Sequence, residues 1–373
     1  MYIMKSWNPL CVFTLLHGFL HAFAGDTECP KTPSAASGNY EVQSLTFDFV
    51  YGSQQTASVS EDRRTNKNAF RIVQYNVEWL FVDYYNQADC PGEQCTWKNQ
   101  TEALTHLSYV SNVIKDINPD IVNFCEVEGC DELNMIIANL QDTSYKSYLK
   151  KGTDSATGQN TGMITRIDPL VDLYRTEDRY NYPIPGSKCG YTGAPGTSGV
   201  SKHYITEFRL NNVDVAFIGA HLLAYPTDPE RCAEREAQVQ LLQNVIVDYY
   251  TRDYEIIIMG DFNDFDGKIL DANNNKPISQ VLDILKGNFG DYSGKYQLYS
   301  VADTMAQPLR FSDWWDKNND CNSTANEFSM IDHMLVTKFI KDHITISYIY
   351  QDYDEFCGKY NSDHYPVVID LVI

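Results

Sequence analysis

Basic residues are scarce in this 373-residue chain: 29 Lys and Arg stand against 50 Asp and Glu, which gives a net charge of −21. Such an acidic chain is poorly suited to broad electrostatic attraction to nucleic acid or to anionic membranes. Low-complexity runs and short repeats are absent, and after residue 23 no apolar run is long enough to span a bilayer. Collagen-like and wholly disordered classes are therefore excluded, and the composition is that of a globular protein.

The first 24 residues have the pattern of a secretory signal. Lys5 precedes a mostly apolar stretch over 10–23, and Ala22-Phe23-Ala24 supplies small residues at −3 and −1. We predict a signal peptide over 1–24 and a secreted protein. A membrane anchor is the alternative, disfavoured because the apolar stretch is short and broken by two histidines. Sequons at Asn99 and Asn322 predict a glycoprotein if the host is a eukaryote.

The rest of the chain divides into an extension and one domain. Residues 25–69 are polar, with one alternating strand pattern over 45–51, and we interpret them as an N-terminal extension. From Phe70 onward, helical faces over 104–117 and 228–249 are each followed by a strand run, at 121–124 and 255–259. This order predicts α/β layering, with sheets inside and helices outside, in one domain over 70–373.

Polar residues follow several apolar strand runs within one to three positions. In layered α/β proteins, side chains at strand ends converge on one edge, where loops can hold a ligand over a rigid base. Asp332-His333 and Asp363-His364 form two further clusters beside the last strand runs. The residues that follow the earlier runs are Asn76, Glu126, His221, Asp261 and Asn263.

These residue types suit the hydrolysis of phosphate esters. Carboxylate oxygens suit Mg²⁺, which would offset the negative charges of the protein and of a phosphate together. An ionised Asp can orient or deprotonate water, amides can hold non-bridging oxygens, and imidazolium can stabilise the transition state or protonate the leaving oxygen. Residue types alone carry little weight, because Asp and Asn are common in loops and a single His after a strand is most often structural.

Spacing adds the specificity. Six motifs occur in order: Tyr75-Asn76-Val77-Glu78-Trp79, Cys125-Glu126-Val127, Gly219-Ala220-His221-Leu222, Gly260-Asp261-Phe262-Asn263-Asp264, Ile331-Asp332-His333-Met334-Leu335 and Ser362-Asp363-His364-Tyr365-Pro366. Over about residues 70–373 the chain thereby resembles the endonuclease/exonuclease/phosphatase superfamily with the deoxyribonuclease I-like fold. The resemblance implies an α/β (α+β) fold, a four-layer αββα sandwich of two β-sheets flanked by helices. It also implies phosphoester cleavage with a divalent metal, Mg²⁺ or else Mn²⁺ or Ca²⁺.

The resemblance assigns roles on the metal side of the site. Asn76 and Glu126 would be metal-side residues, and Asp363 would lie beside the metal. Asp261 and Asn263 would handle the attacking water and the phosphate.

On the phosphate side, the resemblance implies that His221 and His364 contact the scissile phosphate. Asp332 would pair with His364 and fix its tautomer. Lys202 occupies a place where relatives often carry an arginine that contacts phosphate, so we expect a substrate contact there. Deoxyribonuclease-like members carry an acid that pairs with the first histidine, in a stretch that here reads Gly158-Gln159-Asn160-Thr161-Gly162. The orienting partner of His221 therefore stays unidentified.

Three residues neighbour the motifs without an assigned role. Glu78, Glu128 and His333 are common types for loops and rims, so we expect them to lie outside the site.

A few motif residues differ from those of particular branches of this superfamily, and these differences indicate the subfamily. His221 stands where the abasic-site repair branch usually has an amide, and Phe262 and His333 stand where inositol phosphatases typically have Leu and Arg. The motifs look most like those of secreted microbial and protist nucleases. We predict a secreted, Mg²⁺-dependent endonuclease that cleaves DNA, with RNA as an alternative, by in-line attack of an activated water. The runner-up is a sphingomyelinase-like phosphodiesterase with a phospholipid substrate, and a non-enzymatic binding protein is a third hypothesis, disfavoured because no motif residue is missing.

Removing the signal would leave nine cysteines, so at least one thiol is unpaired within the chain. An oxidising compartment favours disulfides, and no pair has the Cys-x-x-Cys spacing of a zinc knuckle. We expect Cys125 to be buried. Cysteines near the loops of the expected site suggest the bridges Cys189–Cys232 and Cys321–Cys357, and a short loop suggests Cys90–Cys95.

Overall fold

The computed structural model describes residue 29 and residues 61–84, 96–353 and 360–373. The expected signal peptide and the strand pattern over 45–51 lie outside these residues. Within them, no helix combines the length and the apolar character that crossing a membrane requires.

Two β-sheets form the centre of the domain. The six-stranded sheet has the order β14-β15-β1-β2-β4-β3, and the five-stranded sheet has the order β10-β13-β9-β8-β7. The strands of the first sheet are β1 (Phe70–Leu80), β2 (Ile121–Val127), β3 (Lys146–Leu149), β4 (Asn160–Thr165), β14 (Ile344–Ile349) and β15 (Val367–Leu371). Those of the second are β7 (Lys202–Leu210), β8 (Val213–His221), β9 (Glu255–Asp261), β10 (Tyr299–Ser300) and β13 (Asp332–Val336). Two short ribbons pair β5 (Tyr180–Tyr182) with β6 (Gly196–Ser198) and β11 (Asp313–Trp314) with β12 (Phe328–Ser329).

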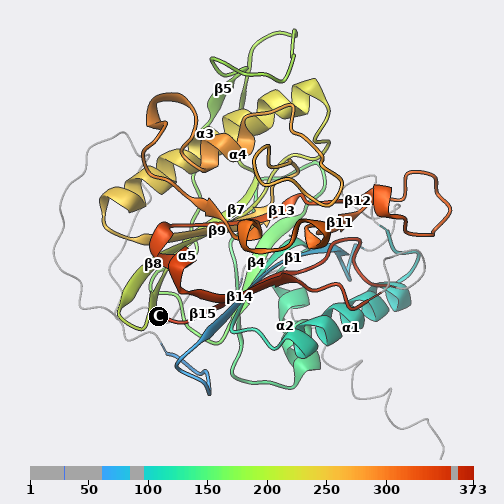
Figure 1. The fold of residues 1–373 in the computed structure, drawn as a ribbon. Coiled ribbons are helices and arrows are strands. Elements are labelled where there is room, and N and C mark those ends of the chain that lie inside the picture. The colour runs from blue at the N-terminus through green and yellow to red at the C-terminus, as the bar shows by residue number, and fades with distance from the viewer. Residues whose placement is uncertain (1–28, 30–60, 85–95, 354–359) are drawn as a thin grey trace, which may run out of the picture.

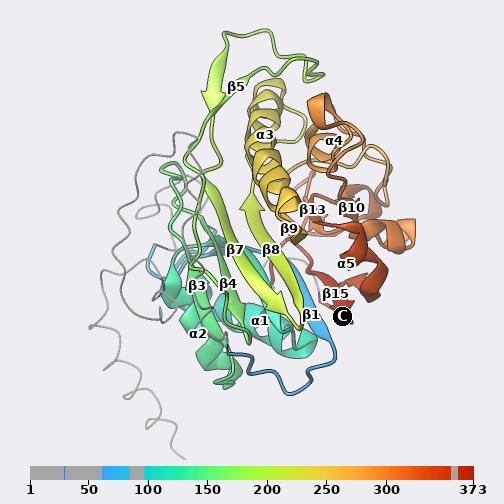
Figure 2. The same cartoon turned by 90° about the vertical axis from the view of Figure 1, so that its left-hand side faces the viewer.

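Helices cover the outer face of each sheet. Their bounds are α1 (Gln100–Ile117), α2 (Cys130–Leu140), α3 (Pro229–Thr251), α4 (Val281–Leu285) and α5 (Lys338–His343). The described residues also include the 3₁₀ turns η2 (Gly290–Tyr292), η3 (Val301–Thr304), η4 (Gln307–Leu309) and η5 (Ala325–Glu327). In Figure 1, α1 and α2 lie below one sheet while α3 and α4 lie above the other, and Figure 2 shows the same layering from the side. The αββα sandwich predicted from the sequence is confirmed.

Alternation along the strands explains this layering. On β1, Phe70 and Ile72 point to the core between the two sheets, whereas Val73 and Tyr75 pack under α1 and α2. A third apolar cluster fills the space between β8, β9 and α3. Because β1 is buried on both faces, apolar residues point to both sides of it, and its polar residues Gln74, Asn76 and Glu78 are buried as well.

The two expected helices are present, and side-chain caps fix where they begin. The side chain of Asn99 accepts a hydrogen bond from the Glu102 N–H at the start of α1. At the start of α3, Asp228 accepts from the Arg231 N–H and Pro229 takes the first helical position.

Part of the expected N-terminal extension packs on the domain. Asp62 bridges to Ile167, and Arg63 Nη1 lies 2.6 Å from Asp168 Oδ1. The guanidinium of Arg64 stacks on the ring of Phe70. Residues just before the first strand thus help to cover the sheet.

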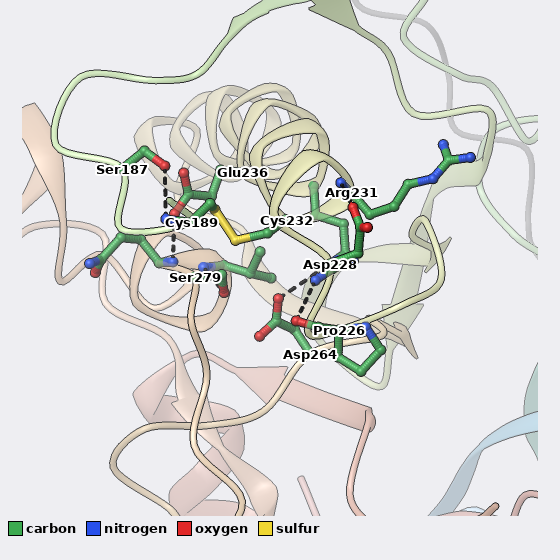
Figure 3. Close-up of a disulfide and its surroundings, with 12 residues drawn as sticks. Ser187, Cys189, Pro226, Asp228, Arg231, Cys232, Glu236, Asp264 and Ser279 are labelled. Atoms are coloured by element: carbon green, nitrogen blue, oxygen red, sulfur yellow. Dashed lines mark hydrogen bonds and ion pairs between the residues drawn. A yellow bond between two sulfur atoms is a disulfide. The ribbon is translucent and has the colours of Figure 1, made fainter. Parts of the chain in front are cut away.

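One of the three predicted disulfides lies fully within the described residues. The bridge Cys189–Cys232 is confirmed and ties the loop after β5 to α3 (Figure 3). Cys125 is confirmed as a buried free thiol. A bridge between Cys29 and Cys130 was not predicted. Cys321 is disulfide-bonded, but Cys357 lies outside the described residues, as do Cys90 and Cys95, so these two pairings stay predictions.

Candidate active site

The site forms where strands of both sheets end together. β1 and β2 are parallel neighbours in one sheet, and β8 and β9 are parallel neighbours in the other. Asn76 and Glu126 therefore lie at one edge of the first sheet, and His221 and Asp261 lie in register at the matching edge of the second. The hydrogen bond from Asn76 Nδ2 to Asp261 Oδ2, 3.1 Å long, joins the two edges.

Asn76 is the central contact of the site. Besides Asp261, its amide nitrogen contacts Glu126 Oε1 at 3.1 Å and approaches His364 Nε2 at 3.4 Å. Its Oδ1 accepts from the Glu78 N–H. The side chain is fully buried, so this amide fixes the spacing between two carboxylates and an imidazole without adding charge.

Asp261 is held by the loop that follows it. The backbone N–H of Asn263 donates to Asp261 Oδ1 at 2.9 Å, and the Asn263 side chain donates to Asp261 Oδ2 at 3.2 Å. Asn263 has a φ of 50°, a left-handed conformation that asparagine tolerates better than most residues. Burial, together with the nearby charge of Asp332, raises the pKa of Asp261 to about 8, so this carboxyl is poised to exchange a proton near neutral pH.

His364 is paired as the resemblance implied. Its Nδ1 lies 2.7 Å from Asp332 Oδ2. Burial alone would lower the pKa of His364, but the charges of Asp332 and Asp363 outweigh it and hold the pKa well above its ordinary value. His364 is therefore a cation in this pocket.

His221 has a different environment. Its Nε2 lies 3.5 Å from Asp261 Oδ2 and 3.9 Å from Glu126 Oε1. Its Nδ1 is buried and finds no hydrogen-bond partner among the described residues, so the expected orienting partner does not appear there. Burial and the charges of Lys202 and His364 lower the pKa of His221 well below its ordinary value. One histidine of the site is thus neutral and the other charged.

Lys202 lies beside His221, because the two residues are cross-strand partners in the ladder of β7 and β8. It is buried, and its Nζ donates to Gln159 Oε1 at 3.1 Å and lies 3.8 Å from Asp154 Oδ2. Gln159 lies in the stretch where relatives carry an acid that pairs with the first histidine. Here it accepts a hydrogen bond from Lys202 and not from His221.

Two further carboxylates belong to the site. Glu78 is only 8% exposed and accepts from the Asp363 N–H at 3.1 Å, so the expectation that it lies outside the site is wrong. It stands two residues after Asn76, a spacing that could have identified it. Asp313, whose Oδ1 lies 3.6 Å from His364 Nε2, was missed because no apolar run or motif precedes it.

The other two neighbouring residues lie outside the site. Glu128 accepts from the N–H groups of Val82 and Asp83 and holds the loop after β1. His333 is not a rim residue, because it is 1% exposed on β13, with its Nε2 2.9 Å from the carbonyl oxygen of Asp264. Its neighbour Asp332 points the opposite way, as strand alternation requires.

The donor set fits a divalent cation. Glu126, Asp261 and His221 each bring one ligand atom within 4.8 Å of the others. In the described part of the chain, no lysine or arginine forms an ion pair with Glu126, Asp261 or Asp363. Burial and neighbouring carboxylates raise the pKa of Asp363 to about 7. Carboxylates gathered at one point, with no lysine or arginine paired to them, are what a hard cation with oxygen ligands stabilises.

A two-sheet sandwich with paired acids, amides and histidines at one shared edge defines a phosphoester hydrolase by class. The chain belongs to the Endonuclease/Exonuclease/phosphatase family, whose sequence pattern matches residues 73–364. Members of this family hydrolyse phosphoester bonds.

The solved structures to which the chain is similar have low sequence identity with it. Truncated TDP2 from Caenorhabditis elegans is 14% identical, with a TM-score of 0.49 over 82% of this chain and 98% of that one. An endonuclease/exonuclease/phosphatase family protein from Bacteroides thetaiotaomicron is 17% identical, with a TM-score of 0.48 over 82% and 98%. A humanized D. rerio TDP2 is 15% identical, with a TM-score of 0.47 over 82% and 100%. A search of curated proteins found no match.

Proposed function

We propose that this chain is a secreted, divalent-metal-dependent phosphodiesterase that acts as an extracellular nuclease on DNA, with RNA as the alternative substrate. The observation that carries the proposal is the contact of Asn76 with Glu126 and Asp261, beside the Asp332–His364 pair. This arrangement places a base (Asp261), a positively charged imidazole (His364) and a neutral amide (Asn76) around one point. In-line attack of water on a phosphodiester requires such a combination of groups.

The chain's own residues divide the work between nucleophile and phosphate. Asp261, in its ionised form, orients the attacking water and accepts its proton. Asn76 and Asn263 donate amide N–H groups to Asp261 and so hold that carboxyl group toward the attacking water. His364, held as imidazolium by Asp332, stabilises the charge that develops on the phosphate, and neutral His221 contacts the same group from the second sheet.

A divalent cation completes this chemistry. Glu126 and Asp363, with Glu78 behind them and the side-chain oxygen of Asn76 nearby, would hold Mg²⁺ or Mn²⁺. When bound, the cation supplies Lewis-acid stabilisation of the phosphate and its leaving oxygen.

Two features support the proposed secretion. The bridges Cys29–Cys130 and Cys189–Cys232 require an oxidising compartment to persist. Asn99 and Asn322, the sequon asparagines, are both exposed.

The test is a comparison of substrates with the purified mature protein. Plasmid DNA, RNA and sphingomyelin are each incubated with added Mg²⁺ or with excess chelator, and Asp261→Asn is compared with Asp342→Asn, an exposed aspartate in a surface ion pair. We expect metal-dependent cleavage of nucleic acid that Asp261→Asn lowers by a factor of about 10² or more and Asp342→Asn leaves unchanged. Turnover of sphingomyelin alone would favour the runner-up, and full activity in chelator would contradict the metal-dependent mechanism.

A further inference from the structure

Two buried amides lie behind the catalytic pair. Gln74 is on β1, two residues before Asn76, and is therefore on the same face of the strand. Asn123 is its register partner on the neighbouring strand β2. Both side chains are 0% exposed, and they lie in the space between the two sheets.

The hydrogen bonds of these amides run in one direction. Gln74 Nε2 donates to Asp332 Oδ1 at 3.1 Å and to the thiol sulfur of Cys125 at 3.6 Å, and Asn123 Nδ2 donates to Gln74 Oε1. An ionised carboxylate can only accept, so Gln74 must present its amino group to Asp332 and keep its carbonyl oxygen for Asn123. Asp332 thereby fixes the orientation of both amides.

The other oxygen of Asp332 is fixed as well. Its Oδ2 accepts from Ser312 Oγ at 3.0 Å and faces His364 Nδ1 at 2.7 Å. Gln74 therefore holds one oxygen from the first sheet while Ser312 and His364 hold the other, and the carboxylate cannot rotate without breaking a buried hydrogen bond.

Packing alone does not account for Gln74. The residues before it on the same face of β1, Phe70 and Ile72, belong to the apolar cluster between the sheets. A buried amide in such a stripe is costly unless its groups are paired, and an apolar side chain would fill the same place. Gln74 touches no residue of the proposed metal side, but it binds the partner of the charged histidine.

We propose that Gln74 is a positioning residue for the reaction: it orients the Asp332 carboxylate so that His364 keeps its Nδ1–H on Asp332 and directs Nε2 toward the phosphate. Asn123 holds the Gln74 amide in the orientation that this requires. The inference deepens the proposed function and rests on it for its kinetic consequence, whereas the geometry at His364 is independent of the substrate.

The experiment compares two buried glutamines. Gln74→Met keeps the side-chain volume and removes the donor to Asp332. Gln243→Met is the matched control, because Gln243 lies on α3, is 1% exposed, and its Nε2 donates to the carbonyl oxygen of Ile284 on α4 at 2.6 Å, away from the site. Asn123→Leu is a second variant that keeps Gln74 but removes its orienting donor.

Two readouts separate positioning from stability. The first is the ¹H–¹⁵N resonance of His364 Nδ1–H, assigned by its loss in His364→Asn. The second is kcat and KM on the phosphodiester that the protein cleaves. For Gln74→Met we expect a displaced or exchange-broadened resonance and a kcat lower by about 10- to 100-fold, the usual effect of an outer partner, with KM within about twofold. Gln243→Met should leave the resonance and kcat unchanged, and Asn123→Leu should displace the resonance less than Gln74→Met does.

Two outcomes would overturn the proposal. One is an unchanged His364 resonance in Gln74→Met or, if that variant does not fold, in Asn123→Leu. The other is an equal fall of kcat in Gln74→Met and Gln243→Met, which would make the role purely structural. If no phosphodiester is cleaved, the proposed function fails, while the resonance still decides whether Gln74 positions the pair.

Discussion

Arg235 on α3 joins the two loops that leave the catalytic strands. It is 0% exposed, and its Nε lies 3.1 Å from Asp264 Oδ2, directly after the Asp261 motif. Its other nitrogens donate to the carbonyl oxygens of four successive residues, Leu223 to Pro226, in the loop after His221. Figure 3 shows Asp264 and Pro226 side by side beneath α3. Arg235→Met removes all five donated hydrogen bonds and leaves the carboxyl of Asp264 buried.

The expected loss is large for a single substitution. Removing one partner of a buried ion pair costs about 3–5 kcal/mol, which is a substantial part of the roughly 5–15 kcal/mol that stabilises a typical domain. Burial already raises the pKa of Asp264 even with the arginine present, so in Arg235→Met the carboxyl should take up a proton. That uptake becomes harder as pH rises, so the loss of stability should be greater at pH 8 than at pH 5.

The assay is urea unfolding at both pH values, with Arg231→Met as the control. Arg231 lies on the same helix and pairs with Glu234 at 3.0 Å, but it is 45% exposed, and an exposed pair contributes at most about 1 kcal/mol. A loss below about 1 kcal/mol in Arg235→Met, or a loss equal at the two pH values, would refute the reasoning.

Three further outcomes follow from the structure. Burial and neighbouring carboxylates raise the pKa of Asp363, one of the residues proposed to hold the metal, to about 7. Protons should therefore compete with Mg²⁺ or Mn²⁺, and calorimetry should show the affinity for the metal falling as pH drops from 8 to 6; an unchanged affinity would contradict this site. Burial, followed by the charge of Arg175, lowers the pKa of His203 to about 3, so at this position the unfolded state alone gains a proton as pH falls below about 6.5. His203 should thereby contribute about 2 kcal/mol to the loss of stability between pH 7 and pH 5. His203→Gln, which can still accept from the Thr176 N–H, should reduce that loss, and the same pH dependence in both proteins would show that another group is responsible. A Cβ on Gly260 would lie 1.6 Å from the Ala220 carbonyl oxygen on the parallel strand, whereas one on Gly267 would meet Pro277 Cγ at 3.4 Å, an ordinary contact. Gly260→Ala should therefore abolish soluble expression or sharply lower the melting temperature. Gly267→Ala, the control, should do neither.

Much of the fold and site could be predicted from the chain because they depend on local patterns. Apolar runs that stop at a polar residue mark β1, β2, β8 and β9, and the residues after them converge in the structure. Helical periodicity marks α1 and α3 for the same reason. The pair His364 and Asp332 came from the resemblance, since 32 residues separate them and no local pattern joins them.

The rest depends on contacts between distant segments. Asp313 enters the site through a bridge to His364, and a two-residue strand carries no periodicity. Cys29 and Cys130 are 101 residues apart, so their pairing is set by how the segments pack. Glu78 was misjudged because a glutamate after a strand is usually solvated, and only the fold shows that Asp363 closes over it.

The site lies where the edges of the two sheets meet, and this position affects which substitutions can alter its chemistry. Asn76 and Glu126 belong to one sheet and Asp261 and His221 to the other, so the geometry of the proposed active site depends on how the two sheets are aligned. A substitution in the apolar layer between them can alter the chemistry while every catalytic side chain is intact. Each sheet supplies only part of the site, so neither sheet alone would be active. The site forms only when the two sheets pack against each other.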